Sequence, residues 1–168
     1  MKRIILILTF VLYGAMAFAQ STNPLNYSGR MFVSSYEVLS TPRYVSYEDH
    51  GILSSDLTIP VTEVTTLLSD FENGSIKSGE TEYKVKVTNT KKYTLTDGTW
   101  VVVIYLQTLD GSTRFEYIWR EYGHAYLDTI NKQDDGTFKI IRMNLSKKPQ
   151  STSPDEALLQ MLGSYGDF

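Results

Sequence analysis

Apolar and polar residues alternate along much of the second half of the chain, which is typical of strands with one buried face. Three Asp-Gly pairs separate the alternating segments from Thr81 onward. Asp-Gly between such segments is a strong hairpin signal, because hairpin turns require positive φ angles. The pattern therefore predicts an antiparallel meander with turns at Asp97-Gly98, Asp110-Gly111 and Asp135-Gly136.

The strands around Asp110-Gly111 can be aligned, because strand side chains point to alternate faces. A two-residue type I′ turn places large apolar and aromatic side chains opposite one another on one face. The predicted pairs are Leu106 with Phe115, Ile104 with Tyr117, and Val102 with Trp119. A slip of one residue would move Tyr117 and Trp119 to the other face, so the pattern specifies this alignment.

A two-residue turn at Asp97-Gly98 would extend this face with two further aromatic residues. It pairs Leu95 with Trp100 and Tyr93 with Val102. So much aromatic area on one face suits either a packed core or the wall of a ligand cavity. The predicted ligand-binding residues are Tyr93, Trp100, Ile104, Phe115, Tyr117 and Trp119.

The third Asp-Gly pair predicts a longer loop. A two-residue turn there would place Lys132 opposite Lys139, which is unfavourable. A three-residue loop ending in a left-handed Gly136 places Asp128 opposite Arg142 instead. We therefore predict the three-residue loop at this hairpin.

The first half of the chain is less regular. The segment RMFVSSYEVLS, residues 30–40, predicts a strand that ends before Pro42, and short strands are predicted at 43–47 and 51–59. In residues 60–71 apolar residues recur three, four and three positions apart, which predicts a short helix. The threonines of the same segment favour a strand, so both interpretations stay open.

The C-terminal residues carry the clearest helix signal. Ser153 is a predicted N-cap that forms a capping box with Glu156, and Pro154 occupies the first helical position. Leucines that follow give the helix one apolar side. We predict that this side covers an apolar patch on the opposite face of the sheet. The patch residues are Val101, Val103 and Ile118.

These elements predict a mainly β fold, an antiparallel meander of about eight or nine strands forming a barrel or a strongly curved sheet. The arrangement is similar to the lipocalin-like barrels, which also carry a helix against the outer wall. The resemblance is one of architecture, since Gly29-Arg30-Met31 stands where a Gly-x-Trp motif is expected. The β domain is predicted over residues 30–146, and a linker with the packed helix over 147–168.

Residues 1–19 have the three parts of a secretory signal peptide. Lys2 and Arg3 form a positive n-region, an apolar segment follows, and Ala17-Phe18-Ala19 is a small-x-small cleavage site. The apolar segment is shorter than the ~20 residues that a membrane-spanning helix needs. We therefore predict a bacterial protein exported to the periplasm, outer surface or medium. It has no membrane span after cleavage, and residues 20–29 form a flexible lead.

Composition and charge narrow the function classes. The chain has 16 Lys and Arg against 19 Asp and Glu, a net charge of −3. Removal of Lys2 and Arg3 takes this to about −5. Basic residues are scattered, whereas a nucleic-acid-binding protein usually has a basic face, so no nucleic acid is expected. Cysteine is absent, so the exported chain depends on its core rather than on disulfides.

Residues that could perform chemistry are few. His50 lies beside Glu48 and Asp49, but three neighbours in a turn cannot readily face one ion, so neither a metal nor a cofactor is predicted. His124 has carboxylates nearby in sequence and could serve as the general base of a hydrolase. We favour a strand-end histidine among tyrosines and predict no catalytic residue, because no companion nucleophile can be named. The tripeptide at 128–130 resembles an acceptor for bacterial O-glycosylation, with Thr129 as the modified residue.

The leading functional interpretation is a non-enzymatic binding protein of the cell envelope that holds an apolar ligand or a protein partner. Twelve tyrosines suit a binding surface, but ordinary strand composition is the favoured explanation for them. The alternatives are an assembly component of an envelope complex and, behind it, a hydrolase that uses His124 with carboxylates.

Overall fold

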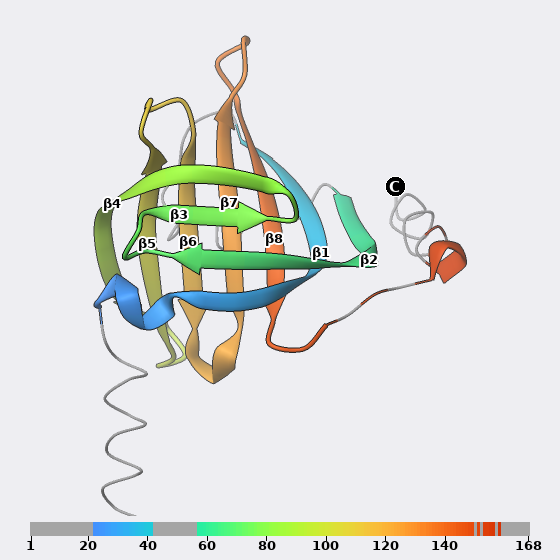
Figure 1. The fold of residues 1–168 in the computed structure, drawn as a ribbon, viewed down its shortest axis with the longest axis horizontal. Coiled ribbons are helices and arrows are strands. Elements are labelled where there is room, and N and C mark those ends of the chain that lie inside the picture. The colour runs from blue at the N-terminus through green and yellow to red at the C-terminus, as the bar shows by residue number, and fades with distance from the viewer. Residues whose placement is uncertain (1–21, 42–56, 150, 152, 157, 159–168) are drawn as a thin grey trace, which may run out of the picture.

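The computed structural model describes residues 22–41, 57–149, 151, 153–156 and 158. These residues form a mainly β structure with eight antiparallel strands in one sheet. Each strand pairs with the next along the chain, and β8 pairs with β1, so the sheet closes into a ring (Figure 1). The strands are β1 (Gly29–Thr41), β2 (Leu57–Asp70), β3 (Ser75–Ser78), β4 (Thr81–Thr94), β5 (Trp100–Thr108), β6 (Arg114–Arg120), β7 (Ala125–Lys132) and β8 (Phe138–Ser146).

The predicted antiparallel meander is therefore confirmed, and the strand expected at residues 30–40 is β1. Two short 3₁₀ helices accompany the strands, η1 (Pro24–Tyr27) and η2 (Glu121–Gly123). The strand predicted at 43–47, most of the one at 51–59 and the turn that contains His50 lie outside the described residues. No helix formed by the described residues is long and apolar enough to cross a membrane.

The three Asp-Gly turns share one local geometry. In each, the glycine N–H donates to the carbonyl three residues earlier, and the glycine φ lies at +77° to +86°. Each aspartate also accepts hydrogen bonds from the backbone N–H and the hydroxyl of the Thr or Ser that follows the glycine. This is the pattern of a type I turn followed by a left-handed glycine.

The β5–β6 hairpin has the predicted register. Its pairs include Leu106 with Phe115, Ile104 with Tyr117, and Val102 with Trp119. The predicted two-residue turn is wrong, because Thr108 N–H donates to Thr113 O at 3.0 Å around a four-residue loop. A two-residue and a four-residue loop with the same centre give the same strand pairing, so the register survives the change of turn.

At the β4–β5 hairpin the predicted register is wrong by one residue. Leu95 N–H donates to Thr99 O at 2.8 Å and closes a three-residue loop. Tyr93 therefore pairs with Val101 instead of Val102. Because side chains alternate along a strand, this change moves Tyr93 from the predicted inner face to the outer face, where it packs in an apolar cluster.

The β7–β8 hairpin is as predicted. Gln133 N–H donates to Thr137 O at 2.8 Å around a three-residue loop, and Gly136 is left-handed with φ +86°. Asp128 consequently pairs with Arg142. The unfavourable pairing of two lysines at this turn is avoided.

The segment with helical spacing at residues 60–71 belongs largely to β2, so the prediction of an internal helix is wrong. Val64 and Leu68, from the apolar side of that helix, are 55% and 36% exposed, whereas Leu67 is buried. The β-branched threonines and valines of this segment prefer extended backbone. Their preference, together with pairing to β1 and β3, decides the conformation.

The inner face of the ring forms the core. One cluster of buried side chains includes residues from all eight strands. Ile104, Phe115 and Tyr117 are buried in it, and Trp100 and Trp119 pack against it while partly exposed. Five of the six predicted face residues therefore point inward, and Tyr93 is the exception.

Among the described residues, side chains from neighbouring strands and from the β4–β5 turn pack against the apolar patch on the outer face. Val101, Val103 and Ile118 have no exposed area. The side chains packed over them are Tyr93, Leu95, Tyr105 and Tyr126.

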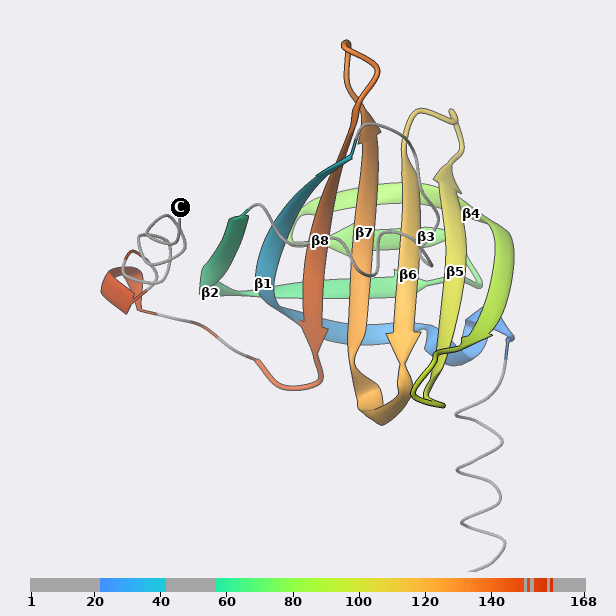
Figure 2. The ribbon, with the colours of Figure 1, turned by 180° about the vertical axis from the view of Figure 1, so that it is seen from behind.

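The described part of the C-terminal segment begins a helix with the predicted capping box. Ser153 Oγ accepts from Glu156 N–H, and a Glu156 carboxylate oxygen accepts from Ser153 N–H, both at 3.3 Å. These residues are exposed and lie beside β1 and β2, on the side away from β5 and β6 (Figure 2). The predicted cover over the outer patch is therefore not formed by this part of the helix.

Candidate functional site

One end of the ring contains a hollow of about 340 Å³. Its lining residues come from η1, the start of β1, β6 and the residue after β8. The ends of β6 and β8 lie at the bottom of the ribbon in Figure 2. We call it the end hollow. Its lining residues are Asn26, Tyr27, Ser28, Gly29, Arg30, Met31, Tyr117, Trp119 and Lys147.

Hydrogen bonds to β2 fix the wall that η1 contributes. The Ser69 hydroxyl accepts from Gly29 N–H at 3.1 Å and can donate to Tyr27 O at 3.2 Å. Phe71 N–H donates to Ser28 Oγ at 3.1 Å. These three bonds hold residues 27–29 against a strand that is distant in sequence, so the wall is positioned by the fold and not by a loose segment.

The lead predicted over residues 20–29 is thus not a free segment where the structure describes it. Asn23 caps η1 by accepting from Leu25 N–H at 3.1 Å, and Pro24 follows it at the start of the helix. Tyr27 is only 5% exposed. The Asn-Pro pair before an aromatic residue is the sequence signal for this element, since both residues favour a helix start.

Aromatic rings form the apolar side of the end hollow. The ring centroids of Tyr27 and Trp119 are 5.6 Å apart, and those of Tyr117 and Trp119 are 6.2 Å apart. Phe71 lies behind Tyr117 in an edge-to-face contact at 5.6 Å. The tilted rings are in the distance range of favourable aromatic pairs, so the wall is a packed unit.

The Tyr117 hydroxyl is the one buried side-chain polar atom of the described residues that has no hydrogen-bond partner. The side chain is 1% exposed. Burial raises the pKa of Tyr117, and the neighbouring Ser69 hydroxyl opposes that rise, although no hydrogen bond of acceptable geometry joins the two groups. The phenol therefore keeps its proton at neutral pH and has a free donor.

The charges around the end hollow are positive. Arg30 and Lys147 line it and are exposed, and the lining residues that the structure describes include no Asp or Glu. The Lys147 ammonium lies 5.9 Å from the centroid of the Trp119 ring, which is within the range of a cation–π contact. This distribution contrasts with the whole chain, in which acidic residues outnumber basic ones.

The predicted ligand-binding residues divide between three places. Tyr117 and Trp119 line the end hollow. Trp100 and Ile104 belong to the core cluster, as does Phe115, whose ring contacts Tyr83 at 5.3 Å. Tyr93 lies on the outer face. The remaining members of the end hollow were not predicted, because Arg30 and Lys147 are ordinary charged residues in sequence and only the ring closure brings them together.

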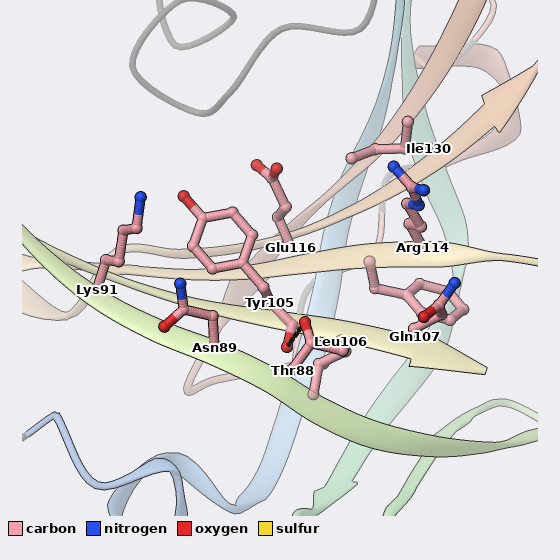
Figure 3. Close-up of a pocket in the computed structure, with 10 residues that line it drawn as sticks. Thr88, Asn89, Lys91, Tyr105, Leu106, Gln107, Arg114, Glu116 and Ile130 are labelled. Carbon is pink, nitrogen blue, oxygen red and sulfur yellow. Dashed lines mark hydrogen bonds between the residues drawn. The ribbon is translucent and has the colours of Figure 1, made fainter. Parts of the chain in front are cut away.

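A second hollow, of about 420 Å³, lies on the outer face of β4 to β7 (Figure 3). Lys91, Tyr105 and Glu116 point away from the strands in the same direction. The Tyr105 hydroxyl lies 2.8 Å from the Tyr93 hydroxyl. Because cationic, acidic and amide groups alternate on this wall, it does not favour one ligand charge. The lining residues are Thr88, Asn89, Lys91, Tyr105, Leu106, Gln107, Arg114, Phe115, Glu116 and Ile130.

The residues considered for chemistry are not brought together. His124 is exposed at the end of η2, and its side chain forms no hydrogen bond with another described residue. Thr129 is half-buried within β7 and pairs with Phe115 and Ile141. In the described part of the chain, no three His, Cys, Asp or Glu residues lie together as metal ligands.

No protein-family model, curated protein or solved structure matches the chain.

Proposed function

We propose that the protein is a non-enzymatic binding protein and that the end hollow holds a small, largely apolar molecule. The sequence supports export through residues 1–19, so the binding is proposed to take place in the bacterial cell envelope or outside the cell. In this proposal the ring of strands is a small lipocalin-like barrel with a filled interior, and the ligand enters at one mouth.

The observation that carries the proposal is the Tyr117 hydroxyl. Folded proteins leave few buried polar groups without a partner, because each costs about 1–3 kcal/mol. Here the unsatisfied group belongs to a residue that lines a hollow. A bound molecule with a polar atom at this position would supply the missing partner.

Size and lining are consistent with this use. Pockets for small molecules begin at about 300 Å³ and are mainly apolar and aromatic, with few polar groups. The end hollow measures about 340 Å³ and has Tyr27, Met31 and Trp119 on its wall. Small-molecule pockets also occur in the mouths of β-barrels, and the proposal places the ligand at such a mouth.

The two tryptophans of the chain allow a direct test, because Trp119 lines the end hollow and Trp100 does not. Bromobenzene is a neutral apolar probe whose bromine quenches tryptophan fluorescence at short range. We expect saturable quenching in the Trp100→Phe protein, which keeps Trp119. The Trp119→Phe protein, which keeps Trp100, should show only weak quenching that rises linearly with concentration.

Competition with benzene, which has no heavy atom, should reverse the saturable quenching. Linear quenching of both tryptophans would mean that the probe only collides with the surface. That result would contradict a binding site in the end hollow.

A further inference from the structure

The chemistry of the end hollow specifies a ligand class, and this inference rests on the proposed function. We propose that the ligand is an amphipathic carboxylate with a flat aromatic body. Its carboxylate lies at Arg30 and Lys147, its ring lies against Tyr27 and Trp119, and a second polar atom at the far end accepts a hydrogen bond from the Tyr117 hydroxyl.

The preference for an anion follows from the charged residues of the lining. Arg30 and Lys147 both line the end hollow, and its described lining residues include no Asp or Glu, in a chain with 19 acidic and 16 basic residues. Among the described residues neither Arg30 nor Lys147 forms an ion pair, and the Lys147 ammonium lies over the face of the Trp119 ring. Both groups are free to bind a carboxylate, Arg30 through two parallel hydrogen bonds.

The orientation of the ligand follows from how deeply each polar group of the end hollow is buried. Arg30 and Lys147 are exposed, whereas Tyr117 is 1% exposed. The carboxylate can therefore keep part of its hydration at the rim, and the cost of burying a charge is avoided. Only a neutral acceptor is suited to the deep end, where the protonated Tyr117 hydroxyl offers a single donor.

The flat shape proposed for the ligand follows from the Tyr27 and Trp119 rings of the wall. Tyr27 and Trp119 are tilted by 55° to one another, and Trp119 is partly exposed. A flat aromatic ligand can make offset or edge contacts with both rings. The thioether of Met31 adapts to the edge of such a ring.

Three probes with the same ring and different charge test the anion preference: 2-naphthoate, its neutral methyl ester and the cationic 2-naphthylmethylamine. Calorimetric titration of the exported protein should give the lowest Kd for 2-naphthoate, about tenfold or more below the ester. The advantage should shrink as salt increases, because the rim cations are exposed.

Replacing the two cations tests their role. In the double variant Arg30→Ala, Lys147→Ala the ratio of the ester Kd to the naphthoate Kd should fall close to one. The matched control is Lys132→Ala, Lys139→Ala, which removes two exposed lysines beside the β7–β8 turn at the other end of the ring. In that control the ratio should keep its original value.

The Tyr117 hydrogen bond is tested with 6-hydroxy-2-naphthoate. This compound should bind roughly fivefold more tightly than 2-naphthoate, in line with one added hydrogen bond. In Tyr117→Phe the advantage of the hydroxyl compound should disappear.

The outcomes separate the inference from the proposed function. If the acid, ester and amine bind equally, or if none binds while bromobenzene still quenches Trp119, the carboxylate inference is wrong and the binding site stands. If neither bromobenzene nor any naphthalene probe binds, both are wrong.

Discussion

The Arg142 guanidinium donates from Nε and Nη2 to the two carboxylate oxygens of Asp128, at 2.8 and 2.9 Å. The pair lies on the outer face of the ring, yet Asp128 has no exposed area and Arg142 is 8% exposed. The three-residue loop between β7 and β8 sets the register that places the two side chains opposite one another. One turn therefore fixes both the hairpin and a buried ion pair.

Asp128→Asn should lower the free energy of unfolding by about 3–5 kcal/mol, because it removes the negative charge that accepts two hydrogen bonds from the buried Arg142 guanidinium. Urea denaturation followed by circular dichroism measures the loss. The control is Glu82→Gln, which breaks the exposed ion pair of Glu82 with Lys84, 2.7 Å long. Its urea midpoint should not change. Equal effects of the two substitutions would show that the Asp128 pair is not buried.

The aspartate of the central turn should make stability depend on acid pH. The hydroxyl of Thr108, followed by the backbone and hydroxyl of Ser112, lowers the pKa of Asp110 to about 2. The pKa of Asp110 is lower in the folded protein than in the unfolded chain. The ionised carboxylate therefore stabilises the fold above about pH 4, and this stabilisation is lost as pH falls toward 2. The Tm difference between wild type and Asp110→Asn should therefore shrink below pH 4. A constant difference from pH 7 to pH 2 would contradict the shift.

Replacing each of two left-handed glycines with alanine should lower Tm to different extents. Gly74 and Gly79 have φ +62° and +57°, so a Cβ strains both, by about 1–2 kcal/mol. At Gly74 the Cβ would also lie 2.6 Å from Val85 O, whereas at Gly79 nothing lies within 4 Å. Gly74→Ala should thus lower Tm clearly more than Gly79→Ala. The reverse order would mean that the backbone at Gly74 can move away from β4.

The turns show how far local sequence determines this fold. Asp-Gly fits a two-residue loop with two positive φ angles and also a type I turn before a left-handed glycine. The hydroxyl residue after each glycine is the feature that selects the second geometry, since Thr99, Ser112 and Thr137 all donate to the preceding aspartate. That residue does not determine the loop length, because the same contacts accompany a three-residue loop at Asp97 and a four-residue loop at Asp110. The face on which Tyr93 lies therefore depends on the pairing of β4 with β5 and not on the turn signal alone.

The candidate site was predictable only in part, for a topological reason. Tyr117 and Trp119 follow from the alternation within one hairpin, which is local. Arg30 and Lys147 come from opposite ends of the β domain, and both line the end hollow because β1 pairs with β8. The strand pattern predicted a barrel or a strongly curved sheet, but not which residues of β1 and β8 pair. The unsatisfied Tyr117 hydroxyl is a property of packing.

Export gives a prediction independent of the binding site. Expressed in a Gram-negative host, the protein should lose residues 1–19 and begin at Gln20, because cleavage follows the small-x-small sequence. Mass spectrometry of the periplasmic and culture fractions measures the new terminus. An intact chain that starts at Met1 and stays in the membrane fraction would contradict the signal peptide.

Substitutions at Tyr117 separate the ring from its hydroxyl. Tyr117→Phe removes only an unpartnered polar group, so the free energy of unfolding should stay unchanged or rise slightly. Tyr117→Ala also removes the contacts with Phe71 and Trp119 in a packed core, and it should cost about 3–5 kcal/mol. Urea denaturation without ligand measures both. A loss of more than about 1 kcal/mol in Tyr117→Phe would show that the hydroxyl has a partner in the free protein, with Ser69 as the nearest group able to provide one, and would remove the main support for a ligand at this position.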